Sequence, residues 1–307
     1  MTESREALLQ ELQTITKWEK EQKDLWFWEK LGRLPFMLLD RLTPRIVQDK
    51  IGAALDEIGK FLQNGGDYLV SERAIVRRLE KAAGEATGEH VELSLTRNNR
   101  TNDTESDETS QAEDGGHVED PANAEIQTLS RTVALRELPL AVMDKVADDL
   151  GSSRTDIATV QGATTGFGGM FTLAVDIPAL LGLSLKVLQE TAICYGFDPK
   201  EERERKFIVK CLQFASSDIV GKKAILEELA DYDNPHKNVQ VMSQLQGWRE
   251  VAAAYRDSYG WKKLFQLVPI AGAVFGAFSN RESLAQVAEA GKMLYRKRRI
   301  MERLQLH

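Results

Sequence analysis

The hydrophobic and polar positions of the chain recur with the period of an α-helix. In most segments apolar residues return at i, i+3, i+4 and i+7, and no run shows the period of two that is typical of a half-buried β-strand. The clearest apolar stripe consists of Leu181, Leu185, Leu188, Ala192 and Tyr195. This pattern predicts an all-α protein built as a multi-helix bundle.

Start and stop signals divide the pattern into separate helices. Residues 4–31 and 71–83 are amphipathic stretches, and a later apolar stripe ends at Gly151. Because glycine lowers helix stability and is common at helix ends, we expect that helix to stop there. A final helix is expected over residues 281–303.

The best-marked junction lies between residues 195 and 202. Gly196 is a natural left-handed C-cap for the helix before it. Asp198, Pro199 and Glu201 then predict an N-cap, a first helical position and a capping-box acid for the next helix. We therefore expect a helix that starts at Pro199.

Two apolar, glycine-rich segments interrupt the amphipathic pattern, over residues 157–183 and 264–278. Glycines four residues apart let two helix backbones approach closely. The candidate functional glycines are Gly162, Gly166, Gly168, Gly169, Gly272 and Gly276. We expect these glycines to form seams at which other helices pack.

Asp176 is the only charged residue between Ile157 and Lys186, and Pro178 follows it by two positions. We expect Asp176 to cap a helix that begins at Pro178, and so to act as a hinge between two pieces of the first segment. The alternative is a buried polar anchor at a helix break that contacts a ligand or a partner.

Neither apolar segment fits a transmembrane helix well. The first reaches the roughly 20 residues needed to span a bilayer only by including Asp176 and Pro178. The second is too short at fifteen residues. A re-entrant or surface-lying hairpin fits both lengths better, and soluble core helices are the alternative.

An acidic segment separates two helical parts. Between residues 85 and 120 there are eleven acidic and two basic residues, so the rest of the chain is slightly positive although the whole carries −7. Residues 84–124 also contain almost no large apolar side chain, which predicts a disordered linker. We expect an N-terminal helical part over 1–83 to pack with a C-terminal part over 125–307.

Few residues carry recognisable chemistry. The four histidines (His90, His117, His236 and His307) lie in the linker, in a turn and at the last position, none at metal-ligand spacing. We therefore expect no metal, no cofactor and no catalytic residue, and Asp176 or Asp198 is the acid–base candidate if the protein is an enzyme. Cys194 and Cys211 fit reduced residues on apolar helix faces of a cytoplasmic protein.

The C-terminal helix carries a dense group of basic residues. Such a group near an apolar segment is typical of a contact with anionic lipids, and Trp261, Lys262 and Lys263 flank the second apolar segment in the manner of an interfacial anchor. Nucleic acid is disfavoured because few aromatic residues lie beside the basic ones. The candidate membrane-contact residues of the helix are Lys292, Arg296, Lys297, Arg298 and Arg299.

The order of several motifs resembles the EcsC family. These motifs are Trp18-Glu19, G-x3-G-x-G-G from Gly162, V-D-I-P-A-L-L, Y-G-F-D-P, K-K-L-x-Q-L-x-P-I-x-G-A-V-x-G-A and Y-R-K-R. The resemblance implies a bacterial protein without a known catalytic activity. It also implies a link to an ABC transporter, beside whose gene the family's name-giving gene is found, and to the cytoplasmic face of the membrane.

The leading hypothesis is a cytoplasmic, peripheral membrane-associated accessory or adaptor protein that contacts anionic lipids. A soluble lipid-binding module with an internal apolar cavity is the first alternative. An undescribed enzyme that uses Asp176 or Asp198 is the second.

Overall fold

A computed structural model describes residues 3–23, 61, 70–88, 134–167, 170–217, 219–230, 232–233 and 269–306. Throughout these ranges the regular elements are helices, which confirms the all-α prediction. The elements are α1 (Arg5–Lys23), α5 (Glu72–Thr87), α7 (Leu140–Phe167), α8 (Met170–Cys194), α9 (Glu202–Ser216), α10 (Ile219–Leu229) and α12 (Pro269–Leu306). The predicted linker over 84–124 lies mostly outside the described residues.

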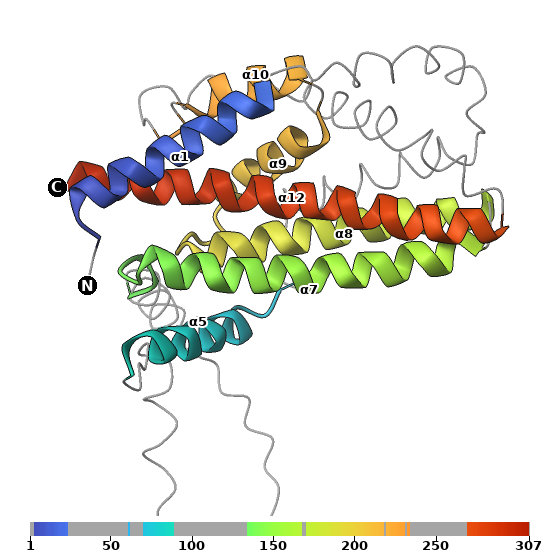
Figure 1. Cartoon of the computed structure of the whole chain (residues 1–307), viewed down its shortest axis with the longest axis horizontal. Coiled ribbons are helices and arrows are strands. Elements are labelled where there is room, and N and C mark those ends of the chain that lie inside the picture. Colours follow the sequence, from blue (N-terminus) through green and yellow to red (C-terminus); the bar gives the residue numbers. More distant parts are fainter. Residues whose placement is uncertain are drawn as a thin grey trace, which may run out of the picture.

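Three long helices, α7, α8 and α12, lie side by side and form the centre of the molecule (Figure 1). Helix α12 runs antiparallel to α7, because Arg303 bonds the Leu138 carbonyl just before α7 whereas Lys292 reaches Asp148. It runs parallel to α8, since Arg299 contacts the end of α8. Helix α12, at 38 residues, thereby joins elements from both halves of the chain.

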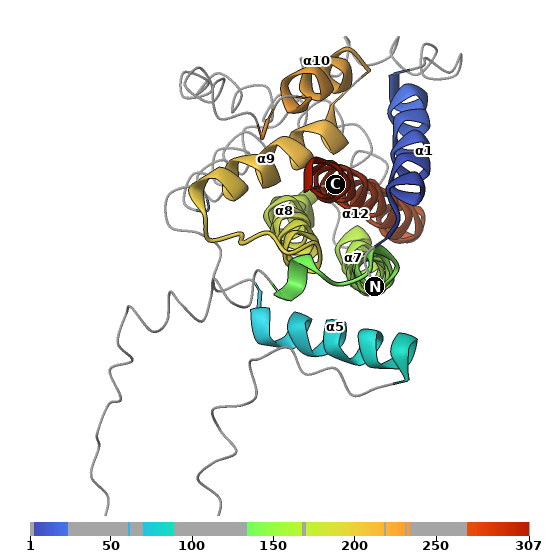
Figure 2. The ribbon, with the colours of Figure 1, turned by 90° about the vertical axis from the view of Figure 1, so that its left-hand side faces the viewer.

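Shorter helices cover this centre on two sides (Figure 2). Helix α5 lies across α7 and α8 on one side, and α9 packs against α8 and α12 on another. Helix α1 packs against α12 and also contacts α10, and α10 in turn packs against α9. The helices that precede the acidic segment therefore contact helices that follow it.

The core follows the apolar stripes of the sequence. Each member of the stripe on α8 is buried: Leu181, Leu185, Leu188, Ala192 and Tyr195. On α1 the buried face consists of Leu8, Ile15 and Trp18, at helical spacing. Burial of such a face, rather than intrinsic propensity, supplies most of the stability of each helix.

Helix α8 ends as the sequence predicts. Gly196 has φ +74°, its N–H donates to the Ile193 carbonyl, and the Phe197 N–H donates to the Ala192 carbonyl. These two bonds form a Schellman motif, in which a left-handed glycine lets the chain turn away from the helix axis. The turn delivers Phe197 to the core, where it is buried.

Three predicted helix boundaries are wrong. Helix α7 continues through Gly151. A Cβ added at Gly151 would lie 3.2 Å from the Cβ of Ala288 on α12, so the two helices pack closely here. This tertiary contact outweighs the low helix propensity of glycine. Helix α8 runs from Met170 through positions 176 and 178, so Asp176 is neither a helix N-cap nor a hinge between two helices. Helix α12 joins the second apolar segment, from Pro269, to the basic C-terminal part.

The start of α9 also differs from its prediction. The helix begins at Glu202 rather than Pro199. Asp198 instead accepts a hydrogen bond from the Lys200 N–H at 2.9 Å, which forms a local turn of the kind that competes with an N-cap. Proline at 199 is thus part of the turn before the helix.

Close helix approach occurs at a glycine that the sequence did not single out. A Cβ at Gly291 of α12 would lie 2.6 Å from Leu188 Cδ2 of α8. A Cβ at Gly182 of α8, in contrast, would meet no atom of another residue within 4 Å. The seam between α8 and α12 therefore depends on Gly291.

We expect Gly291→Ala to lower the free energy of unfolding by about 1–3 kcal/mol, because the methyl group overpacks the α8–α12 seam. Gly182→Ala is the matched control and should raise it by roughly 0.5–1 kcal/mol, since alanine is the better helix former in open space. Urea unfolding followed by far-ultraviolet circular dichroism measures both. Equal effects of the two substitutions would contradict the predicted seam.

Candidate functional site

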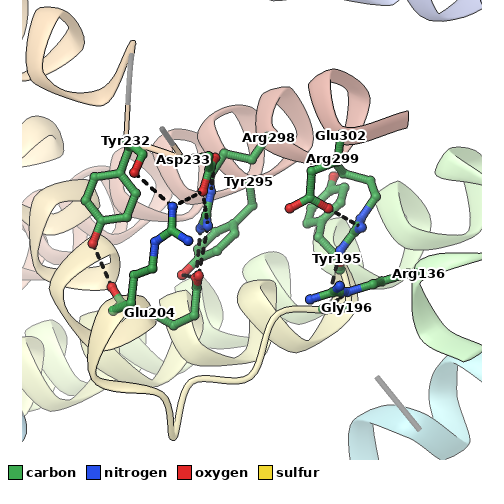
Figure 3. A network of polar contacts seen from close by, with 11 residues as sticks. Arg136, Tyr195, Gly196, Glu204, Tyr232, Asp233, Tyr295, Arg298, Arg299 and Glu302 are labelled. Carbon is green, nitrogen blue, oxygen red and sulfur yellow. Dashed lines mark hydrogen bonds and ion pairs between the residues drawn. The ribbon is translucent and has the colours of Figure 1, made fainter. Parts of the chain in front are cut away.

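The most prominent polar feature is a buried ion pair between Arg298 of α12 and Glu204 of α9 (Figure 3). Two parallel hydrogen bonds join the side chains, Nη1 to Oε2 at 2.7 Å and Nη2 to Oε1 at 2.8 Å. The exposed fractions of the side chains are 8% and 4%. This two-pronged geometry fixes α9 against α12 in one register.

Aromatic rings enclose the Arg298 guanidinium. Its central carbon lies 4.2 Å from the ring centroid of Phe197 and 4.1 Å from that of Phe207. Tyr295 stacks edge-on against Phe207 at 4.8 Å between centroids. The rings exclude water and add cation–π attraction to the ion pair.

Asp233 extends this cluster beyond α10. Its carboxylate accepts hydrogen bonds from Arg298 at 2.8 and 3.0 Å and from Arg203 at 2.8 Å. The Tyr232 hydroxyl donates to the Arg203 carbonyl at 2.7 Å. Residues 232 and 233 are therefore held to both α9 and α12.

Arg299 performs a different task at the end of α8. Its Nε and Nη2 donate to the Tyr195 carbonyl at 2.8 and 2.5 Å, and Nη1 pairs with Glu302 at 2.6 Å. A cation at a helix C-terminus satisfies free carbonyls and interacts favourably with the helix dipole. Burial lowers the pKa of Arg299 to about 10, with the positive charges of Arg136 and Arg303 adding to that effect.

Asp144 of α7 connects the remaining helices. It accepts a 2.5 Å bond from the Tyr195 hydroxyl and two bonds from Arg296, at 2.9 and 3.0 Å. Arg296 also pairs with Glu11 of α1 at 2.9 Å. We call the set of buried and half-buried contacts made by Arg296, Arg298 and Arg299 the arginine clasp.

The basic residues of α12 are thus turned towards protein rather than solvent. Lys292 pairs with Asp148 at 2.6 Å and Lys297 with Glu19 at 2.6 Å. The residues that the sequence offers as membrane contacts on this helix bind groups of the protein itself, and their contact with a membrane stays a prediction; they are Lys292, Arg296, Lys297, Arg298 and Arg299. The sequence shows which basic residues share a face of this helix, but it does not show which acids of other helices pair with them.

The other candidate residues are dispersed. Asp198 lies in the turn between α8 and α9. Positions inside helices are Gly162 and Gly166 in α7, Asp176 and Pro178 in α8, and Gly272 and Gly276 in α12. Positions outside the described residues are Gly168, Gly169, Trp261, Lys262 and Lys263.

The acids of the clasp were missed, although one of them leaves a trace in the sequence. Glu204, Phe207 and Cys211 have the spacing i, i+3 and i+7, which puts them on one face of α9. An acid therefore stands within an otherwise apolar face. Arg298 likewise continues the stripe of Val287 and Leu294 on α12. A charge on a buried stripe predicts a buried partner of opposite sign.

The chemistry open to this cluster is limited. Its charged groups bind one another, and burial raises the pKa of the hydroxyls of Tyr195 and Tyr295. Cys194 and Cys211 are free and buried, as expected, and burial raises the pKa of both thiols. Within the described ranges no three His, Cys, Asp or Glu side chains are placed to hold a metal ion, and no helix is long and apolar enough to cross a membrane.

Comparison with known proteins identifies the family. The model of the EcsC protein family matches residues 9–300. The chain belongs to the EcsC protein family. Two motifs that carry the family resemblance meet in the arginine clasp, Y-G-F-D-P from Tyr195 and Y-R-K-R from Tyr295: the rings of Phe197 and Tyr295 lie 5.3 Å apart.

Two relatives from Bacillus subtilis (strain 168) are similar to this EcsC-family chain. The uncharacterized protein YdbA is 52% identical over 303 residues, which cover 99% of this chain and 96% of YdbA. Protein EcsC is 32% identical over 165 residues, which cover 54% of this chain and 67% of that protein. No solved structure matches the chain.

We expect Glu204→Gln to lower the free energy of unfolding by about 3–5 kcal/mol, because Arg298 then keeps a buried charge with a weakened partner. Glu202→Gln is the matched control on the same helix, since Glu202 pairs with Lys206 on the exposed side and an exposed pair contributes little. Urea unfolding of the three proteins measures the difference. Equal stability of Glu204→Gln and the control would contradict the clasp.

The buried tyrosines predict a loss of stability in alkali. Burial raises the pKa of Tyr195, Tyr232 and Tyr295 above the ordinary value, so above about pH 10 the unfolded chain loses these protons while the folded chain keeps them. The free energy of unfolding should therefore fall as the pH rises past about 10, with Arg299 alone acting in the opposite direction. Tyrosinate absorbance of these residues should appear together with the loss of helical circular dichroism; their ionisation in a still helical protein would refute the prediction.

Proposed function

We propose that this EcsC-family protein is a peripheral membrane-associated accessory protein that touches the bilayer with one end of its central helices. The observation that supports the proposal is the separation of charge along α7, α8 and α12. The arginine clasp occupies one end of these helices, and long uncharged stretches occupy the other.

The register of the helices brings the uncharged stretches together. Gly151 of α7 lies beside Ala288 of α12, and Leu188 of α8 lies beside Gly291. Continuing outward from these contacts, residues 157–167, 170–185 and 269–280 reach the same end, where α7 ends and α8 and α12 begin (Figure 1). We call these three ranges the apolar end; Asp176 is their only charged residue.

The described side chains near this end support an interfacial contact. On α7, Ile157 is 44% exposed and Val160 is 65% exposed, although large apolar residues are otherwise mostly buried. The Arg154–Glu190 pair, with bonds of 2.6 and 2.9 Å, lies just before the end and joins α7 to α8. Because this ion pair holds α7 to α8, the apolar end can enter the headgroup region while the two helices stay together.

Contact with one leaflet fits the apolar end better than deep insertion. A carboxylate at the bilayer centre would cost about 2.5–3.5 kcal/mol or more, which keeps Asp176 near the interface or beside a partner. The accessory role beside a membrane protein, such as an ABC transporter, rests on the family resemblance alone. The internal lipid cavity and an enzyme that uses Asp176 or Asp198 stay predictions.

Exchange of the exposed apolar residues tests the proposal. We expect the double substitution Ile157→Gln and Val160→Gln to weaken binding to vesicles roughly ten- to a few hundredfold. Full burial of such a side chain contributes about 1.5–3 kcal/mol, and only the exposed 44% of Ile157 and 65% of Val160 can still leave water. Flotation with vesicles of phosphatidylcholine and phosphatidylglycerol measures this.

A matched control uses exposed apolar residues remote from the apolar end. Leu9 on α1 and Met301 on α12 are 41% and 38% exposed, and their exchange to Gln should leave binding unchanged. If the unsubstituted protein stays in the soluble fraction with every vesicle, the proposed function is wrong.

A further inference from the structure

The outer face of α5 carries a group of exposed basic side chains. Arg73, Arg77 and Arg78 are exposed, and in the described part of the chain none of these arginines makes a hydrogen bond or an ion pair. Lys81 lies one turn further along with 80% of its side chain exposed, and its Nζ is 4.0 Å from Glu85. We call these four residues the α5 basic face.

Two of the three acids of α5 are paired with cations of other parts of the chain. Glu85 is held at 2.6 Å by Lys145 of α7, and Glu72 lies 3.9 Å from Lys200. In α12 the opposite situation holds for Arg296 and Arg298, whose partners are acids of α1, α7 and α9. Among the described residues, α5 therefore carries exposed, unpaired arginines, whereas Arg296 and Arg298 of α12 are paired with acids.

The fold holds these arginines outward. The opposite face of α5 is buried against α7 and α8 and consists of Ile75, Val76, Leu79, Ala82 and Ala83. Since the two faces of a helix are fixed by its period, seating the apolar face leaves Arg73 and Arg77, one turn apart, directed away from the bundle.

The α5 basic face shares a flank of the molecule with the exposed apolar residues of α7. The Lys145–Glu85 pair places α5 beside the α7 face that carries Val142 and Val146, both buried. Ile157 follows Val146 by eleven residues and Val160 follows Val142 by eighteen. At about 100° per residue these spacings are close to whole numbers of helical turns, so Ile157 and Val160 lie on the same face of α7 as the two valines. The face that α5 covers near the start of α7 thus continues, uncovered, as Ile157 and Val160.

We propose that the α5 basic face binds the anionic headgroups of a membrane surface and orients the apolar end towards that surface. The inference rests on the proposed membrane role and names the electrostatic partner of that role. Arginine suits this task because its planar guanidinium binds phosphate oxygens in pairs. Because these three arginines make no ion pair with the described residues, they can bind lipid phosphates without first breaking an ion pair there.

Two other anionic occupants are the alternatives to a membrane surface. Single-stranded nucleic acid is held by basic residues interleaved with aromatic rings, and α5 contains no aromatic residue. The acidic stretch within residues 89–120 follows α5 directly in the sequence, and its binding to the same arginines is one of the outcomes of the test. Both occupants give distinct results in the test below.

The test neutralises the arginines in the full-length protein. Arg73→Gln, Arg77→Gln and Arg78→Gln together should weaken binding to phosphatidylglycerol-containing vesicles by about a hundredfold, at roughly fivefold per cation. The control is Arg5→Gln, Lys17→Gln and Lys20→Gln, three exposed cations of α1 with the same change in net charge. This control should bind like the unsubstituted protein, and circular dichroism should show both variants folded.

The outcomes separate this inference from the proposed function. If the unsubstituted protein binds the vesicles and both triple variants bind equally well, the α5 basic face is not the contact although the membrane role stands. If the α5 variant binds more tightly, the face is occupied by the acidic stretch and the inference is wrong. Binding to single-stranded DNA but not to vesicles, lost in the α5 variant, would overturn both proposals.

Discussion

A buried guanidinium holds this fold together. Arg298 pairs with Glu204 and Asp233 and lies between the rings of Phe197 and Phe207. Burial by itself would lower the pKa of Arg298, but the bonds to Glu204 and Asp233 raise it, so the charge persists inside the protein. Buried ion pairs add little net stability but penalise any arrangement that separates the partners. The pair therefore specifies how α9 and α12 meet.

The clasp has a consequence for the rest of the surface. Because acids of α1, α7 and α9 are taken up by Arg296, Lys297 and Arg298, the most basic stretch of the sequence contributes no free charge. Charge is concentrated at one end of the central helices, and the uncharged residues of the same helices collect at the other. The molecule therefore has one end held by ion pairs and one end with few charges, and the proposed function places the second end at the membrane.

The sequence predicted the helical class, the buried stripe on α8 and the glycine cap at Gly196, since each is a local pattern. It failed where tertiary contact overrides local preference. Gly151 and Pro178 suggested helix ends, yet packing carries α7 and α8 past both. The basic run of α12 suggested a contact with anionic lipids, because the protein's own partners of these residues, such as Asp144 and Glu204, lie far away in the chain. A charge at a position of an apolar stripe was the signal that could have revealed the clasp.

The central claim is that the apolar end, and not the arginine clasp, meets the membrane. Its most direct test attaches an environment-sensitive fluorophore through Val160→Cys or, as the control, Met301→Cys, with the native Cys194 and Cys211 buried from the reagent. Vesicles that contain brominated phosphatidylglycerol then report proximity by quenching. We predict strong quenching at position 160 and none at position 301. Equal quenching at both positions, or quenching at 301 alone, would contradict the account.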